Sequence, residues 1–129
     1  MIKFEHTKHK ALWDTIITLL HDYTRNDISS AAELKMDAFA KLYPECDEPM
    51  CTCYACEYDE NINDTFTEEN RPEACANCPL LWPDEKICDD NDSLYDIFLA
   101  ACRRGDRLKA IRTAKYIRDC PVKENVEIV

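Results

Sequence analysis

The amino-terminal part of the chain carries apolar side chains at intervals of three and four residues. Within residues 4–24 these side chains are Leu12, Trp13, Ile16, Ile17, Leu20 and Tyr23. Because an α-helix has about 3.6 residues per turn, this spacing places all of them on one face. The pattern predicts a first helix over residues 4–24.

A second apolar stripe follows a short polar segment. Ser30 precedes Glu33 by three residues, which is the pattern of a capping box at the start of a helix. The stripe then continues through Leu34, Ala38, Phe39 and Leu42. Pro44 cannot continue a helix because it lacks a backbone N–H group. The pattern predicts a second helix over residues 30–43.

A third helix is predicted over residues 93–104. Asp92 or Ser93 can cap its amino terminus, because a short oxygen-bearing side chain can accept a hydrogen bond from the first turn. Its apolar stripe consists of Leu94, Phe98 and Cys102. Gly105, the single glycine of the chain, stands where a residue with positive φ ends a helix.

A fourth helix is predicted over residues 107–119. Asp106 can cap its start, and Pro121 stops it. One face of this helix is apolar and the remaining positions are rich in lysine and arginine. The last segment, residues 121–129, shows no comparable pattern, and we expect it to be frayed.

The middle of the chain, residues 44–92, lacks any such periodicity. It holds fifteen acidic residues and only two basic ones, Arg71 and Lys86, in a chain whose net charge is −10. A segment this polar and this negative cannot bury enough apolar surface to order itself. We expect a loop region that needs a crosslink to become ordered.

These elements together predict the fold class. The length of 129 residues suits a single domain, residues 1–129, with one modest core. We expect a mainly α fold in which about four helices bracket the loop region, with little or no sheet. The scarcity of glycine also argues against glycine-rich phosphate loops and tight hairpins.

Two C-x2-C pairs in the loop region supply the expected crosslink. Cys53 and Cys56 form the first pair, and Cys75 and Cys78 form the second pair eighteen residues later. This spacing is typical of a structural zinc site, since each short turn can direct two sulfurs to one ion. We predict that these four thiolates bind Zn2+ and hold the acidic loop in place.

Three further cysteines of the region leave the ligand set open. Cys88 lies ten residues after Cys78 and is the strongest substitute for one of the four ligands. Cys46 and Cys51 are weaker substitutes, and we interpret them as loop thiols. An iron–sulfur cluster is the alternative cofactor, because four thiolates also suit iron. The spacing lacks the cysteine runs of common ferredoxins, which favours zinc.

The charge distribution bears on nucleic-acid binding, which is a common activity of zinc knuckles. Phosphate would be repelled by the acidic loop region, so nucleic acid is disfavoured there. The remaining candidate is a basic binding face on and just before the last helix, formed by Arg104, Arg107, Arg112, Lys115 and Arg118. We favour an internal use for these cations, which is to lie against the acidic loop and the thiolates.

Several segments of the chain resemble a known group of proteins. Residues 8–13, 53–58, 75–83 and 114–119 together are similar to small cysteine-knuckle proteins of bacteriophages and prophages. The resemblance implies a metal-binding knuckle, and because those proteins have no assigned activity it implies no catalytic residue. The extra cysteine at position 51 departs from the pattern of the group.

The expected function is non-catalytic. A closed shell of four sulfurs leaves no position for water or substrate, and the histidines, including His6 and His9, are expected at the surface or half-buried. We predict a phage or prophage accessory protein whose acidic surface binds a host or phage protein, as an inhibitor or a DNA mimic. A nucleic-acid-binding protein that uses the basic last helix is the first alternative, and an iron–sulfur protein is the second.

The sequence also bears on location. No run of about 18 apolar residues occurs, and the amino terminus lacks the apolar stretch of a secretory signal. We therefore expect a cytoplasmic protein without a membrane partner, located in the bacterial host cytosol if a phage encodes it.

Overall fold

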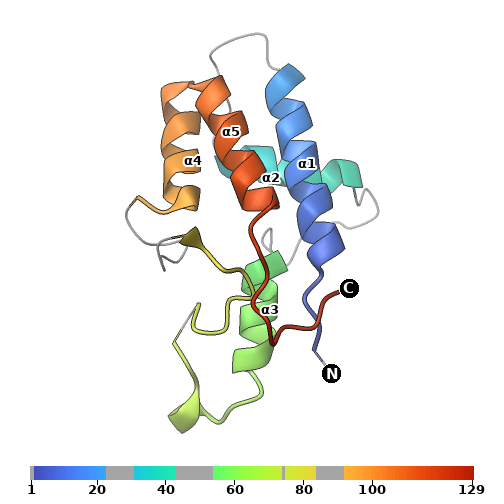
Figure 1. The fold of residues 1–129 in the computed structure, drawn as a ribbon, viewed down its shortest axis with the longest axis vertical. Coiled ribbons are helices and arrows are strands. Elements are labelled where there is room, and N and C mark those ends of the chain that lie inside the picture. Colours follow the sequence, from blue (N-terminus) through green and yellow to red (C-terminus); the bar gives the residue numbers. More distant parts are fainter. Residues whose placement is uncertain (1, 23–30, 43–53, 74, 84–91) are drawn as a thin grey trace.

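The computed structural model describes residues 2–22, 31–42, 54–73, 75–83 and 92–129. Its helices, in chain order, are α1 (His6–Asp22), α2 (Ala31–Leu42), α3 (Tyr54–Asn63), the short 3-10 helix η1 (Glu68–Asn70), α4 (Leu94–Arg104) and α5 (Arg107–Arg118). Figure 1 shows α1, α4 and α5 side by side, with α3 at one end of this group. The predicted mainly α fold class is confirmed, and within the described ranges the chain forms isolated β-bridges without a strand.

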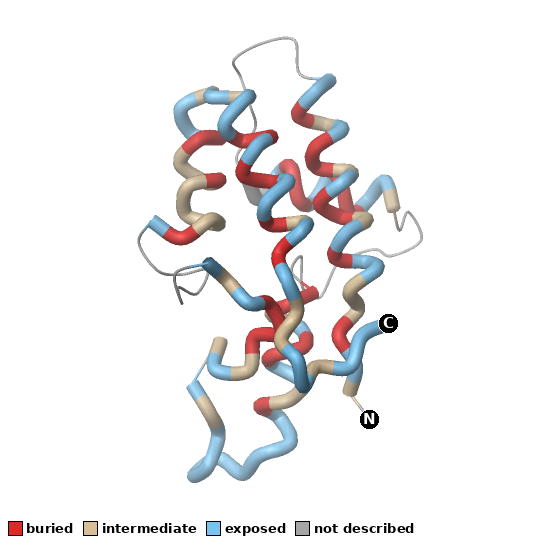
Figure 2. The backbone as a smooth tube through the Cα atoms, in the orientation of Figure 1, coloured by how far each residue is buried: buried red, intermediate tan, exposed pale blue. Residues whose placement is uncertain are grey.

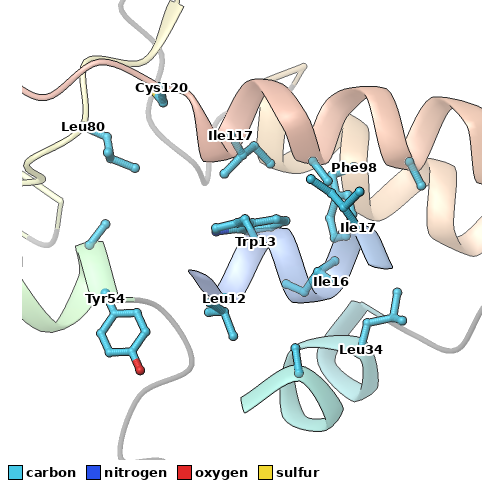
Figure 3. Packing of buried hydrophobic residues seen from close by; sticks show 14 of the residues in the cluster. Leu12, Trp13, Ile16, Ile17, Leu34, Tyr54, Leu80, Phe98, Ile117 and Cys120 are labelled. Atoms are coloured by element: carbon cyan, nitrogen blue, oxygen red, sulfur yellow. The ribbon is translucent and has the colours of Figure 1, made fainter. Parts of the chain in front are cut away.

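The hydrophobic core lies between α1, α2, α4 and α5 and extends to α3. Helix α5 packs against both α1 and α4, and α2 packs against α1. In Figure 3 the indole of Trp13 on α1 faces Ile117 of α5 and Phe98 of α4. The rings of Trp13 and Phe98 meet edge to face, with centroids 5.1 Å apart. Burying a side chain of this size contributes about 1.5–3 kcal/mol, so these rings anchor the helix packing.

The ends of α4 and α5 are fixed by the capping residues that the sequence suggested. The side chain of Ser93 accepts a hydrogen bond from the Asp96 backbone N–H at 3.1 Å. Gly105 ends α4 with a left-handed φ of 71°, which costs little without a Cβ. Asp106 then accepts a hydrogen bond from the Lys109 N–H at 3.2 Å and starts α5. The capping position Ser30 lies outside the described residues.

Helix α3 corrects the prediction that residues 44–92 form a loop region between about four helices. It runs from Tyr54 to Asn63, so the described part of the chain contains five α-helices. Its buried side chains are Tyr54, Ala55, Tyr58, Asp59 and Asn63. Two of these are polar, and this is why the buried face did not stand out as an apolar stripe in the sequence.

The carboxyl-terminal segment was expected to be frayed, and this expectation is wrong. The N–H of Lys123 donates to the Pro79 carbonyl at 2.9 Å, and the N–H of Phe4 donates to the Glu127 carbonyl at 2.8 Å. The N–H of Val129 returns to the Phe4 carbonyl at 2.9 Å. Figure 1 shows the two termini next to each other. Backbone pairing with distant segments therefore orders a tail that has no periodicity of its own.

His9 is also placed differently from the expectation of a surface or half-buried histidine. Its side chain is 2% exposed, and its Nε2–H donates to the Ile117 carbonyl at 3.1 Å. Burial lowers the pKa of His9 to about 4, so the ring is neutral at pH 7. His9 therefore belongs to the core and links α1 to the end of α5.

Within the described segments, none of the helices combines the length and the apolar character needed to cross a membrane.

Candidate metal centre

The structure describes part of the predicted ligand set. Cys56, Cys75 and Cys78 lie within the described residues, whereas Cys53 and the substitutes Cys46, Cys51 and Cys88 lie outside them. Among the described side chains, no three or more His, Cys, Asp or Glu residues form a group that could hold a metal ion. Cys56, Cys75 and Cys78 are among these side chains and form no such group by themselves, and Cys53 lies outside the described residues, so the four-cysteine site stays a prediction.

Cys56 lies in the first turn of α3, and Tyr54, the first residue of this helix, directly follows Cys53 in the sequence. The thiol of Cys56 is half-buried. Helix α3 itself contacts α1, and Tyr54, Ala55 and Tyr58 are members of the main hydrophobic core. The first C-x2-C pair is therefore tied to the folded helical body through the start of α3.

The second C-x2-C pair forms a tight turn. The N–H of Cys78 donates to the Cys75 carbonyl at 3.3 Å, and the N–H of Ala76 donates to the Glu73 carbonyl at 3.1 Å. Cys75 has a φ of 72°, a left-handed conformation that is uncommon for residues other than glycine. A non-glycine residue keeps such a conformation only where its surroundings hold it there.

The carboxylate of Asp59 on α3 provides that support. One of its oxygens accepts the N–H of Cys75 at 2.9 Å, and the other accepts the N–H of Asn77 at 2.7 Å. Asp59 is 5% exposed. Burying a carboxylate is costly unless hydrogen bonds replace its lost water, and these backbone donors do so. The turn is therefore joined directly to α3.

Asn63, one turn further along α3, completes the connection. Its Nδ2 donates to the Asp59 carboxylate at 3.3 Å and to the Glu73 carbonyl at 3.4 Å, and its Oδ1 accepts the Asn77 side-chain amide at 2.7 Å. Asn63 is 2% exposed. Sequence reasoning missed both Asp59 and Asn63, because they looked like two more polar residues of an acidic loop.

The two remaining described cysteines differ from the predicted ligands in their surroundings. Cys102 is 2% exposed, and burial raises its pKa to about 11, which keeps it a thiol at neutral pH. Burial raises the pKa of Cys120 to about 11 as well, with a smaller effect from Cys78, and its Sγ–H donates to the Leu81 carbonyl at 3.2 Å. Both act as buried thiols of the core.

A small cavity of about 190 Å3 lies beside the turn. It is lined by Tyr58, Ile62, Ala76, Asn77, Cys78, Lys123, Asn125 and Val126. The basic residue that lines this cavity is Lys123 of the carboxyl-terminal segment. Its backbone N–H donates a hydrogen bond to the Pro79 carbonyl, which fixes the segment beside the turn. The sequence suggested that cations of the last helix would lie against the thiolates, and here a lysine of the tail lines the cavity beside Cys78.

The predicted basic face is divided in the structure. Arg104, Arg112 and Lys115 are exposed, whereas Arg107 and Arg118 are half-buried. The guanidinium of Arg118 forms ion pairs with Asp14 of α1 at 2.7 Å and with Asp119 at 3.0 Å. Arg118 therefore contributes to the contact between α5 and α1.

Acidic side chains gather on residues 57–73, which we call the acidic arm. Its exposed carboxylates are Glu57, Glu60, Asp64, Glu68, Glu69 and Glu73, and Asp64 is paired with Arg71. Figure 2 shows that the part of the arm that follows α3, at the lower end of the molecule, is mostly exposed, whereas Tyr58, Asp59 and Asn63 on α3 are buried. The arm also carries Phe66, which is 47% exposed. It is thus a negative surface with one exposed large apolar side chain.

Comparisons with protein-family models, with curated proteins and with solved structures found no match.

Proposed function

We propose that this protein is a non-catalytic interaction module whose acidic arm is held in place by a structural Zn2+ ion. The ligands would be Cys53, Cys56, Cys75 and Cys78. Four thiolates form a closed shell, so the ion would supply folding free energy rather than chemistry. The arm would bind a basic surface of another protein.

The observation that carries this proposal is the contact between α3 and the Cys75–Cys78 turn. Asp59 binds two N–H groups of the turn, and Cys56 lies on the same helix one turn earlier. The two C-x2-C sequences are separated by an acidic segment that has little apolar surface. A metal knuckle requires that both C-x2-C sequences lie next to each other, and the buried hydrogen bonds between α3 and the turn bring the turn and the helix that carries Cys56 together. Thiolates are soft donors, which suit zinc or iron.

The charge of the arm supports a protein partner of the opposite sign. Six exposed carboxylates stand against the single cation Arg71 on the arm. Such a patch steers a small protein toward basic surfaces, including those that normally hold nucleic acid, and it repels phosphate. The sequence resemblance to phage and prophage proteins suggests that the partner is a host or phage protein, with inhibition or DNA mimicry as the outcome.

Metal analysis of the purified protein tests the structural part of the proposal. We expect a single bound Zn2+ that Cys56→Ser weakens and that Cys102→Ala, a buried thiol outside the proposed ligand set, leaves in place. Chelation should lower the melting temperature of the wild-type protein. Bound iron and a visible charge-transfer band would point to the iron–sulfur alternative, and an unchanged cooperative melt after chelation of a metal-free protein would refute the structural metal.

Affinity capture tests the interaction. Wild-type protein should retain a discrete partner from a bacterial lysate, and retention should weaken with added salt. The double variant Glu68→Lys with Glu69→Lys should lose that partner, whereas Arg112→Glu on α5 should keep it. Capture that depends on Arg112 and survives the arm variant would instead favour nucleic-acid or acidic-partner binding by α5.

A further inference from the structure

Asp59 and Asn63 both join helix α3 to the cysteine turn, and Asp59 is the one that binds backbone N–H groups of the turn. Its two carboxylate oxygens accept the N–H groups of Cys75 and Asn77 at 2.9 and 2.7 Å. We infer that Asp59 is the positioning residue of the proposed metal centre: it holds the turn that carries Cys75 and Cys78 against the helix that carries Cys56 before any metal binds. This inference rests on the proposed function, and it assigns the residue that prepares the site.

The spacing on α3 explains how the register is set. Cys56, Asp59 and Asn63 stand at i, i+3 and i+7, which places them along one face of the helix. Asp59 and Asn63 both bind the turn, through its backbone and through the side chain of Asn77. The turn therefore lies along the same face that carries Cys56, one helical turn from it.

The chemistry of the contact requires a carboxylate at this position. The turn presents two N–H groups, and only a carboxylate offers an acceptor oxygen to each without also presenting a donor. An asparagine side chain would keep one acceptor and direct an NH2 group at the second N–H. The backbone of Cys75 also has a left-handed φ of 72°, which is unfavourable for a residue other than glycine. The hydrogen bond to Asp59 helps to hold it in this conformation.

The electrostatic setting separates this carboxylate from the others of the arm. Glu60, the next residue of α3, is exposed, whereas Asp59 is 5% exposed. The described hydrogen bonds to Asp59 come from neutral donors, two from the turn and one from Asn63. The hydrogen bonds to the cysteine turn and to Asn63 therefore offset the free-energy cost of burying the Asp59 carboxylate.

Cobalt binding measures the role of Asp59 directly. Co2+ would be titrated into apo wild-type protein, Asp59→Asn and Glu60→Gln, in competition with a chromophoric chelator, and the d–d and thiolate charge-transfer bands recorded. Loss of a group that orients metal ligands weakens binding by roughly 10- to 100-fold, and we expect this for Asp59→Asn. Glu60→Gln removes the same charge from the same helix without touching the turn, so its affinity should match wild type.

The cobalt spectrum and amide exchange distinguish positioning from a general loss of stability. At saturating Co2+ the d–d bands of Asp59→Asn should differ from those of wild type, because the ligands are held differently. In chelator-treated wild-type protein the amide protons of Cys75 and Asn77 should stay protected from exchange, whatever the variant does to folding. Rapid exchange of both amides without metal would overturn the inference, because the turn would then depend on the ion.

The outcomes also separate this inference from the proposed function. If wild-type protein takes up neither Zn2+ nor Co2+, the proposed metal centre fails and the inference fails with it. If wild type binds metal and Asp59→Asn binds it as tightly as Glu60→Gln, with the same spectrum, the centre stands and the positioning role is refuted.

Discussion

Protonation of His9 is expected to make the fold sensitive to mild acid. The side chain is 2% exposed and donates from Nε2 to the Ile117 carbonyl at 3.1 Å, and its ring centroid lies 5.7 Å from that of Phe4. Burial lowers the pKa of His9 from 6.5 to about 4. The folded protein therefore keeps this ring neutral over a range in which an unfolded chain would protonate it.

The magnitude follows from the two pKa values. Above pH 6.5 the ring is neutral in both states, and the full free energy of unfolding is present. As the pH falls from 6.5 to about 4, the unfolded state binds the proton first, so the free energy of unfolding decreases, and below this window the loss levels off. At about 1.4 kcal/mol for each pKa unit, the loss is about 3 kcal/mol, a large part of the stability of a small domain.

This prediction is tested by urea unfolding of the wild-type protein and the variant His9→Gln, followed by far-UV circular dichroism at a series of pH values from 7 to 4. Glutamine keeps an N–H donor for Ile117 and does not titrate. The difference in unfolding free energy between the two proteins should change by about 3 kcal/mol across the window, because contributions from other groups are common to both. Parallel pH profiles would refute the assignment of acid sensitivity to His9.

Two further substitutions test the packing and capping described above. Phe98→Ala should cost about 3–5 kcal/mol of unfolding free energy, because Phe98 is fully buried against Trp13, and tryptophan emission should shift to the red; Tyr116→Ala, at a position 62% exposed, should stay within about 0.5 kcal/mol of wild type. Gly105→Ala should cost about 1–2 kcal/mol in a urea titration, because φ is 71° there, and a neutral result would contradict the cap geometry.

The four helices with apolar periodicity could be located from the sequence, and each of these helices lies within its predicted range with ends that differ by at most two residues. The predicted ranges 4–24, 30–43, 93–104 and 107–119 correspond to α1, α2, α4 and α5. They could be predicted because a helix that packs one face on a core has apolar residues at intervals of three and four. In addition, Gly105 followed by Asp106 is typical of the end of one helix and the start of the next.

Helix α3 was not accessible in this way. Its buried face mixes Tyr54 and Tyr58 with Asp59 and Asn63, and a polar residue can be buried only where specific donors and acceptors meet it. Those donors lie on a turn that begins sixteen residues after Asp59, so no local sequence pattern predicts that Asp59 is buried against them. The metal prediction itself came from cysteine spacing, while the residues that hold the turn came only from the structure.

By itself, the sequence determined the helix-forming segments, the caps of α4 and the start of α5, the concentration of acid in the middle of the chain and the paired cysteines, because each is a local property of composition and period. The tertiary structure decided which polar groups are buried, that the tail pairs with Phe4 and Pro79, and that His9 lies in the core. These features depend on hydrogen bonds between segments distant in the chain, whose free energy appears only when the fold brings both partners out of water together.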